Sequence, residues 1–174
     1  LKSVEILEDL NNPYYKVASS EINHIPLLIK IAETKKPVIL STGVASLEDI
    51  SLAIKTLNDN GCDDITVLKC TAAYPTPLED SNLKAMVAIK DHFEVKVGLS
   101  DHTKGFIAPV VAVALGASFI EKHFILDKTI DTPDRDFSLD PTEFKIMVEA
   151  IRDAEKSLGS REIVVSKKME KARV

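Results

Sequence analysis

The sequence predicts an α/β fold with a parallel sheet, in the form of a partial TIM (β/α)8 barrel of about five βα units. Short apolar runs rich in β-branched residues recur about every 25 to 30 residues, and each is followed by an amphipathic stretch of helical period. Such nearly continuous runs are typical of strands that crossover helices cover on both faces. The chain contains no Gly-x-Gly-x-x-Gly phosphate loop, which argues against a dinucleotide-binding sheet.

The repeating units can be followed in order along the chain. Ser46 and the acidic residues behind it start the clearest helix, and Gly61 follows the end of that helix. Pro26 and Pro141 fit the first turns of two further helices, where proline is tolerated. The expected strands are residues 15–18, 37–40, 65–69, 96–99 and 119–121. The expected helices are residues 25–34, 47–58, 82–92, 107–115 and 141–158.

The number of units determines the expected domain organisation. A complete barrel takes roughly 200 to 250 residues, whereas this chain has 174. We therefore interpret residues 1–159 as the C-terminal part of a (β/α)8 barrel, with residues 1–10 as the tail of a preceding barrel helix. Residues 160–174 turn basic and lose the apolar period, as expected of a linker toward a further domain.

Composition excludes several classes of partner. The net charge of −5 and the pI near 5.4 argue against a general nucleic-acid binder, which usually carries a basic excess. No apolar run reaches the roughly 18 to 20 residues that span a bilayer, so we expect no membrane partner. Cys62 and Cys70 lack the clustering of a zinc site or a disulfide framework, which favours a reduced, cytoplasmic setting.

Polar residues follow each expected strand, where the active sites of β/α barrels are built. They are Lys16, Ser19, Ser20 and Glu21 on the first unit, Ser41 and Thr42 on the second, Lys69, Thr71 and Tyr74 on the third, Ser100, Asp101 and His102 on the fourth, and Glu121, Lys122 and His123 on the fifth. Because parallel strands end at one edge, these hydroxyl, amine and imidazole groups are expected to converge there.

His102 and His123 follow consecutive strands at nearly the same depth. Two imidazoles so placed can reach one ion and leave its other positions for water and substrate. Two histidines with oxygen ligands suit Mn, Fe, Co or Zn better than Mg or Ca. The alternative is that each histidine only makes a hydrogen bond at its own strand end.

Lys16 is expected to be nearly buried within a strand, where an ammonium group needs a partner. It would therefore meet an anion or form an imine, unless it makes an internal ion pair with Glu21 or Asp101. The neighbouring serines add neutral donors and, with a lysine, describe a phosphate or carboxylate pocket. Glu21 is placed for general acid or base work, with a solvated loop carboxylate as the alternative.

An ordered set of motifs resembles the sialic acid synthase family over about residues 1 to 158. The set is Lys-Val-Ala-Ser-Ser-Glu-Ile-Asn at 16–23, Leu-Ser-Thr-Gly at 40–43, Leu-Lys-Cys-Thr-Ala-Ala-Tyr-Pro at 68–75, Gly-Leu-Ser-Asp-His-Thr at 98–103 and Ile-Glu-Lys-His-Phe at 120–124. The last motif and the stretch 131–140 are more similar to bacterial pseudaminic or legionaminic acid synthases than to N-acetylneuraminate synthases.

The resemblance implies condensation of phosphoenolpyruvate with the open-chain aldehyde of an N-acylated amino sugar, which releases phosphate and gives a nine-carbon 2-keto acid. It also implies a divalent metal, Mn or Mg, a homodimer, and an antifreeze-like domain after the linker. The roles it implies are metal binding for His102 and His123, catalysis for these two and Glu21, phosphoenolpyruvate binding for Lys16, Ser19, Ser41 and Ser100, and sugar contacts for Glu21, Tyr74 and Asp134.

Two other functions are compatible with the residues. A Schiff-base aldolase also places a lysine on a barrel strand, here Lys16, and needs no metal. A non-catalytic barrel that binds a sugar phosphate would retain the polar edge without turnover. Under the synthase interpretation we expect these 174 residues alone to be inactive, because about three βα units and the further domain lie outside them.

Overall fold

A computed structural model describes residues 2–163, 165 and 167–170. The strands are β1 (Tyr15–Val17), β2 (Val38–Ser41), β3 (Ile65–Cys70), β4 (Lys96–Asp101) and β5 (Phe119–Lys122). The helices are α1 (Lys2–Asp9), α2 (Ile25–Ala32), α3 (Leu47–Asp59), α4 (Lys84–Phe93), α5 (Ile107–Ala114), α6 (Pro141–Leu158) and α7 (Lys167–Glu170), with 3-10 turns η1 (Ser19–Glu21) and η2 (Leu78–Ser81).

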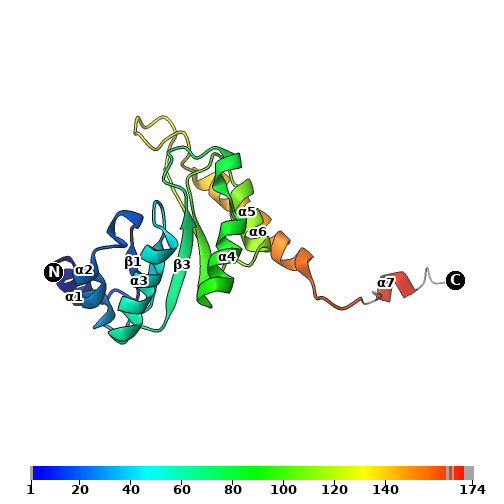
Figure 1. Ribbon diagram of the computed structural model, residues 1–174. Helices are drawn as coiled ribbons and strands as arrows, with labels where there is room; N and C mark the ends of the chain where they lie inside the picture. The colour runs from blue at the N-terminus through cyan, green and yellow to red at the C-terminus, as the bar shows by residue number, and fades with distance from the viewer. Residues whose placement is uncertain (1, 164, 166, 171–174) are drawn as a thin grey trace.

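All five strands are parallel and lie in chain order, β1-β2-β3-β4-β5 (Figure 1). The expected strands and helices are all present, with ends displaced by at most two residues. The fold prediction of repeated βα units that form part of a barrel is therefore confirmed. α1 precedes β1, as expected of the tail of a barrel helix.

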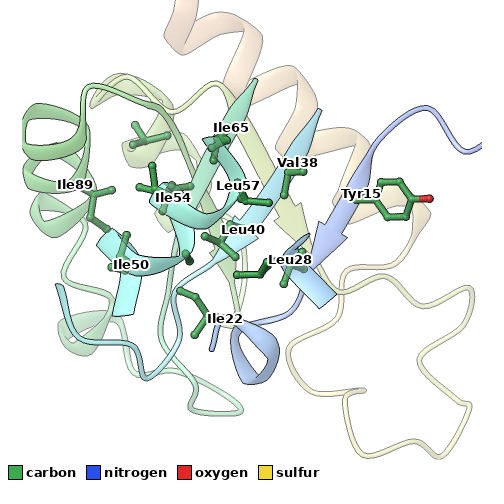
Figure 2. Packing of buried hydrophobic residues seen from close by; sticks show 14 of the residues in the cluster. Tyr15, Ile22, Leu28, Val38, Leu40, Ile50, Ile54, Leu57, Ile65 and Ile89 are labelled. Carbon is green, nitrogen blue, oxygen red and sulfur yellow. The ribbon is translucent and has the colours of Figure 1, made fainter. Parts of the chain in front are cut away.

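The two faces of the sheet differ in chemistry because side chains alternate along each strand. Val38 and Leu40 of β2 point toward the helices and pack with Leu28 of α2 and Leu57 of α3 (Figure 2). All four side chains are at most 1% exposed. The opposite face, which is the inner face of the partial barrel, carries Ser41 and, by the same alternation, Lys16, Ser100 and Glu121.

Gly98 of β4 lies on the inner face, at a place where no side chain fits. An added Cβ would lie 2.3 Å from the backbone oxygen of Phe119 and 2.6 Å from Cδ2 of Leu68. The close approach lets β4 and β5 pair in register just below the site, with Gly98 opposite Phe119. Glycine is the residue that permits such a backbone contact.

The segment after α6 runs away from the body of the molecule toward α7 (Figure 1). Residues 160–163 are exposed, and α7 follows within the predicted linker. The rest of the predicted linker, residues 164, 166 and 171–174, lies outside the described residues. Its role as a linker stays a prediction. None of the helices in the described ranges is long and apolar enough to cross a membrane.

Candidate active site

An ion pair across the inner face shows how strongly the sheet is curved. Nζ of Lys16 on β1 lies 3.4 Å from Oε2 of Glu121 on β5. In a flat sheet, four steps of about 4.8 Å would separate the first and fifth strands by about 19 Å. Curvature therefore brings the two edge strands of the sheet within reach of each other, so that side chains of β1 and β5 meet on the inner face.

Glu121 joins donors from β1 and β4 at this edge. Its Oε1 accepts a hydrogen bond of 2.6 Å from Oγ of Ser100, while Oε2 faces Lys16. The two donors that the sequence assigned to a substrate anion thus already converge on one carboxylate. Glu121 was given no role of its own from the sequence, although its register opposite Ser100 puts both on the same face.

Two expectations about Lys16 are wrong. Its ion-pair partner is Glu121, not Glu21 or Asp101, because curvature joins strands that are distant in sheet order. The side chain is also 28% exposed instead of nearly buried, because β1 has a neighbouring strand on one side only.

Ser41 contributes a hydroxyl without a partner to the same inner face. The residue is 2% exposed, and its Oγ has no hydrogen-bond partner within the described part of the chain. A buried polar atom left unpaired is unfavourable by about 1 to 3 kcal/mol, so a ligand or water is expected to satisfy it. Ser19 in η1 packs against Gly43, just after β2, and so lies beside this strand end.

His102 and His123 lie together at the ends of β4 and β5, with ring centroids 5.2 Å apart. Nδ1 of His102 is 2.9 Å from the carbonyl oxygen of Thr71, and since a carbonyl can only accept, Nδ1 carries the hydrogen. Nδ1 of His123 lies 3.3 Å from Oδ2 of Asp134. The protein thus holds Nδ1 of each ring, as is common for histidines that bind a metal through the other ring nitrogen.

The donor set at this point fits a metal held by two imidazoles. Within residues 2–163, 165 and 167–170, no group of three or more His, Cys, Asp or Glu side chains is arranged so that it could hold a metal ion. A closed set of protein ligands is typical of structural metals, whereas catalytic metals keep positions open. Two imidazoles alone leave the other positions of an ion to water or substrate.

Aromatic rings enclose the histidine pair. The ring of Tyr74 lies 4.2 Å from that of His102 between centroids, and Phe137 lies 4.9 Å from His123. Phe137 is 2% exposed and also faces Tyr74 at 5.9 Å. Phe137 was noted in the sequence only as part of the stretch 131–140 that carries the family resemblance, and it received no site role because it belongs to an irregular loop without a periodic pattern.

Buried neighbours shift the titration of His102 and Cys70. Burial acts to lower the pKa of His102, but hydrogen bonds to Cys70 and to the carbonyl of Thr71 raise it above the ordinary value. Burial acts to raise the pKa of Cys70, yet the contacts with His102 and with the Ser100 hydroxyl lower it overall. Partial burial also raises the pKa of Tyr74.

Glu21 stays apart from these contacts. Its carboxylate lies 3.2 Å from Nδ1 of His24 and 3.5 Å from Oγ of Ser20, both close in sequence. Its side chain is 47% exposed. The structure thus brings Lys16 and Ser100 together through Glu121, and brings the histidines together with Tyr74 and Asp134. Among the residues that the structure describes, the side-chain partners of Glu21 are Ser20 and His24, both close in sequence.

Comparison with known proteins matches both the sequence and the fold. A model described as the NeuB family matches residues 1–163. A pseudaminic acid synthase of Campylobacter jejuni is 48% identical over 173 residues, covering 99% of this chain and 50% of that protein. An N,N'-diacetyllegionaminic acid synthase of the same organism is 47% identical over 161 residues, covering 91% and 48%.

Among solved structures, the N-acetylneuraminic acid synthetase of Leptospira borgpetersenii, crystallised with citrate, superposes with a TM-score of 0.91. It is 31% identical, and the match covers 99% of this chain and 60% of that one. The chain spans about half the length of the curated relatives it matches.

Proposed function

Because the chain belongs to the NeuB family, we propose that it forms the phosphoenolpyruvate-binding and metal-binding part of a sugar-acid synthase. The reaction joins phosphoenolpyruvate to the open-chain aldehyde of an N-acylated amino sugar and yields phosphate and a nine-carbon 2-keto acid. The observation that carries the proposal is the meeting of two groups at one strand edge, namely the donors around Glu121 and the histidine pair.

Phosphoenolpyruvate is assigned to the donors on the inner face. Lys16 and Ser100 already share one carboxylate, which indicates that they can bind the same oxyanion. The unpaired hydroxyl of Ser41 is a further donor for a phosphate or carboxylate oxygen. In this proposal the substrate anion replaces Glu121 as the partner of Lys16 and Ser100, with Ser19 at the margin of the same pocket.

The histidine pair is assigned to a divalent metal, Mn or Mg. His102 and His123 would each offer Nε2, with Nδ1 held by Thr71 and Asp134 respectively. When bound, such an ion supplies Lewis-acid polarisation for an aldehyde and an orienting charge for water. Tyr74 and Asp134 flank the pair and are assigned to the sugar.

The chemistry then balances without any further reactant. The C3 carbon of phosphoenolpyruvate bonds to the aldehyde carbon, whose oxygen takes up a proton and becomes a hydroxyl. The positive charge that develops at C2 is captured by water, which loses one proton. The C2–O bond to phosphate then breaks as the new hydroxyl becomes the keto group, and the second proton goes to the departing phosphate. Lys16, Ser41 and Ser100 hold the phosphoenolpyruvate in place, and Glu21 is assigned to proton transfer.

The sugar is proposed to be of the pseudaminic or legionaminic type. The chain is 48% and 47% identical to relatives named for those products, against 38% for an N-acetylneuraminate-9-phosphate synthase of Mus musculus. In the test, N-acetylmannosamine and the 2,4-diacetamido-trideoxy hexoses are offered in parallel to the protein that carries this chain. The second substrate is phosphoenolpyruvate labelled with ¹⁸O in its bridging oxygen. We expect a trideoxy product by mass spectrometry and the label in phosphate.

A matched pair of variants tests the site. His123→Ala should abolish metal-dependent turnover with the fold intact, whereas His92→Ala on exposed α4 should leave it unchanged. Unchanged activity in His123→Ala would remove the metal pair from the proposal. Chelator-resistant activity, or borohydride trapping of a substrate carbonyl on Lys16, would favour the Schiff-base aldolase. Binding of both substrates without turnover would favour a non-catalytic barrel.

A further inference from the structure

A fully buried ion pair lies directly behind the histidine pair. Nζ of Lys122 is 2.7 Å from Oδ2 of Asp101, and the two side chains are 0% and 1% exposed. Lys122 also donates a hydrogen bond to the backbone carbonyl of Thr103. Asp101 in turn accepts from the backbone N–H of Thr103 at 2.9 Å and from its hydroxyl at 3.2 Å. The pair therefore holds the residues on both sides of His102.

The register of the sheet places this pair outside the substrate space. Asp101 and Lys122 are opposite each other in the last paired position of β4 and β5, one step after Ser100 and Glu121. Ser100 and Glu121 face the inner side of the sheet, so alternation directs Asp101 and Lys122 to the helix side. Each charged residue is followed at once by one of the histidines.

Stability is a weak reason for such a pair. Desolvation of two charges largely offsets their attraction, and apolar residues of similar volume often stabilise a fold as well or better. What the ion pair adds is a set of directed bonds. Lys122, next to His123, bonds to Asp101 and Thr103, which flank His102. This fixes the two backbone segments that present the imidazoles.

We propose that the Asp101–Lys122 pair is a positioning unit that sets the spacing and orientation of His102 and His123 for a divalent cation. The proposal rests on the proposed function, since it assumes that these histidines bind the ion. Groups that orient metal-binding side chains from behind typically change metal affinity by about 10- to 100-fold when they are removed. The same range is expected here.

The test measures the Mn²⁺ affinity of the protein that carries this chain by titration, with free Mn²⁺ followed by electron paramagnetic resonance. The variant Asp101→Leu/Lys122→Met replaces the charges by apolar groups of similar size and leaves no lone buried charge. The control Asp64→Leu/Lys96→Met removes an exposed pair, 2.8 Å apart, at the opposite end of β4. We expect Mn²⁺ to bind about 10- to 100-fold more weakly in the first variant and unchanged in the control.

Phosphoenolpyruvate affinity and melting temperature provide the readouts that separate positioning from folding. The affinity should stay near the parent value in the first variant, because neither side chain faces the inner side. The melting temperature should also stay near the parent value, because apolar residues of similar volume replace the pair. Thr103→Val keeps the shape of a residue that is 1% exposed and removes only its hydroxyl. This variant should weaken Mn²⁺ binding by a smaller factor and leave the melting temperature unchanged. It replaces the double variant as the test if the double variant does not fold.

The outcomes distinguish the two proposals. Parent-like Mn²⁺ affinity in a folded double variant, or in Thr103→Val if the double variant does not fold, overturns the positioning role and leaves the histidine site standing. Failure of the parent to bind Mn²⁺ overturns the histidine site and with it this inference. Weakened binding in the double variant but not in the control supports the positioning unit.

Discussion

Lys16→Met tests the assignment of phosphoenolpyruvate to the inner face. Methionine keeps the length and apolar stem of lysine but removes the ammonium group, which lies 3.4 Å from Glu121. In the proposed complex this group bonds to the substrate anion instead. The variant should therefore lose affinity for phosphoenolpyruvate without losing the fold.

The size of the effect follows from the kind of bond and its exposure. A hydrogen bond to a charged group contributes about 1.5 to 3 kcal/mol net. At about 1.36 kcal/mol for each factor of ten, this range corresponds to about 10- to 160-fold in the dissociation constant. The side chain of Lys16 is 28% exposed, and partial exposure weakens an ion pair through solvent screening. We therefore expect the dissociation constant for phosphoenolpyruvate to rise by about 10- to 40-fold, in the lower part of this range.

The assay is calorimetric titration of phosphoenolpyruvate into the protein that carries this chain, in the presence of Mn²⁺. The matched control is Lys30→Met on α2, which removes an exposed ion pair of 3.1 Å with Glu33 and should leave the affinity unchanged. A dissociation constant for Lys16→Met within threefold of the parent value would contradict the assignment. Equal losses in both variants would point to a general effect of net charge instead.

Two predictions concern the fold that carries the site. Gly98→Ala should lower the free energy of unfolding by about 1 to 3 kcal/mol, because its Cβ would meet the backbone oxygen of Phe119 at 2.3 Å; a change below about 0.5 kcal/mol in urea unfolding would contradict this. Burial and the hydrogen bond to Glu8 raise the pKa of Tyr15 to about 12. The free energy of unfolding should therefore fall between pH 10 and 12, as the unfolded phenol ionises first, and fall less steeply in Tyr15→Phe; parallel slopes would refute this.

Local patterns in the sequence were sufficient to predict the elements of the fold. The apolar period and the capping residues placed all five strands and the helices α2 to α6, with α6 at its observed bounds, whereas α7 falls in the stretch predicted to be a linker. Ser46 and Asp49 form the capping box at the start of α3 that the sequence indicated. Such signals are short in range, so they do not depend on how the sheet curves.

The contacts within the site depended on geometry that local patterns do not contain. Glu121 was missed as the partner of Lys16 because their meeting requires the curvature of all five strands. The separation of Asp101 and Lys122 from the site could have been inferred from alternation along β4 and β5, since each directly precedes a histidine. Phe137 lies in a loop, where neither an apolar period nor a capping residue indicates which way its side chain points.

The chain-order pairing of the strands has a consequence for how the protein forms. Each strand pairs with the next one synthesised, so paired residues lie only about 20 to 30 positions apart. Short separations keep the entropy lost on closing each loop small and nearly equal from unit to unit. The sheet can therefore grow strand by strand as the chain leaves the ribosome, whereas the Lys16–Glu121 contact must wait for β5 to be made.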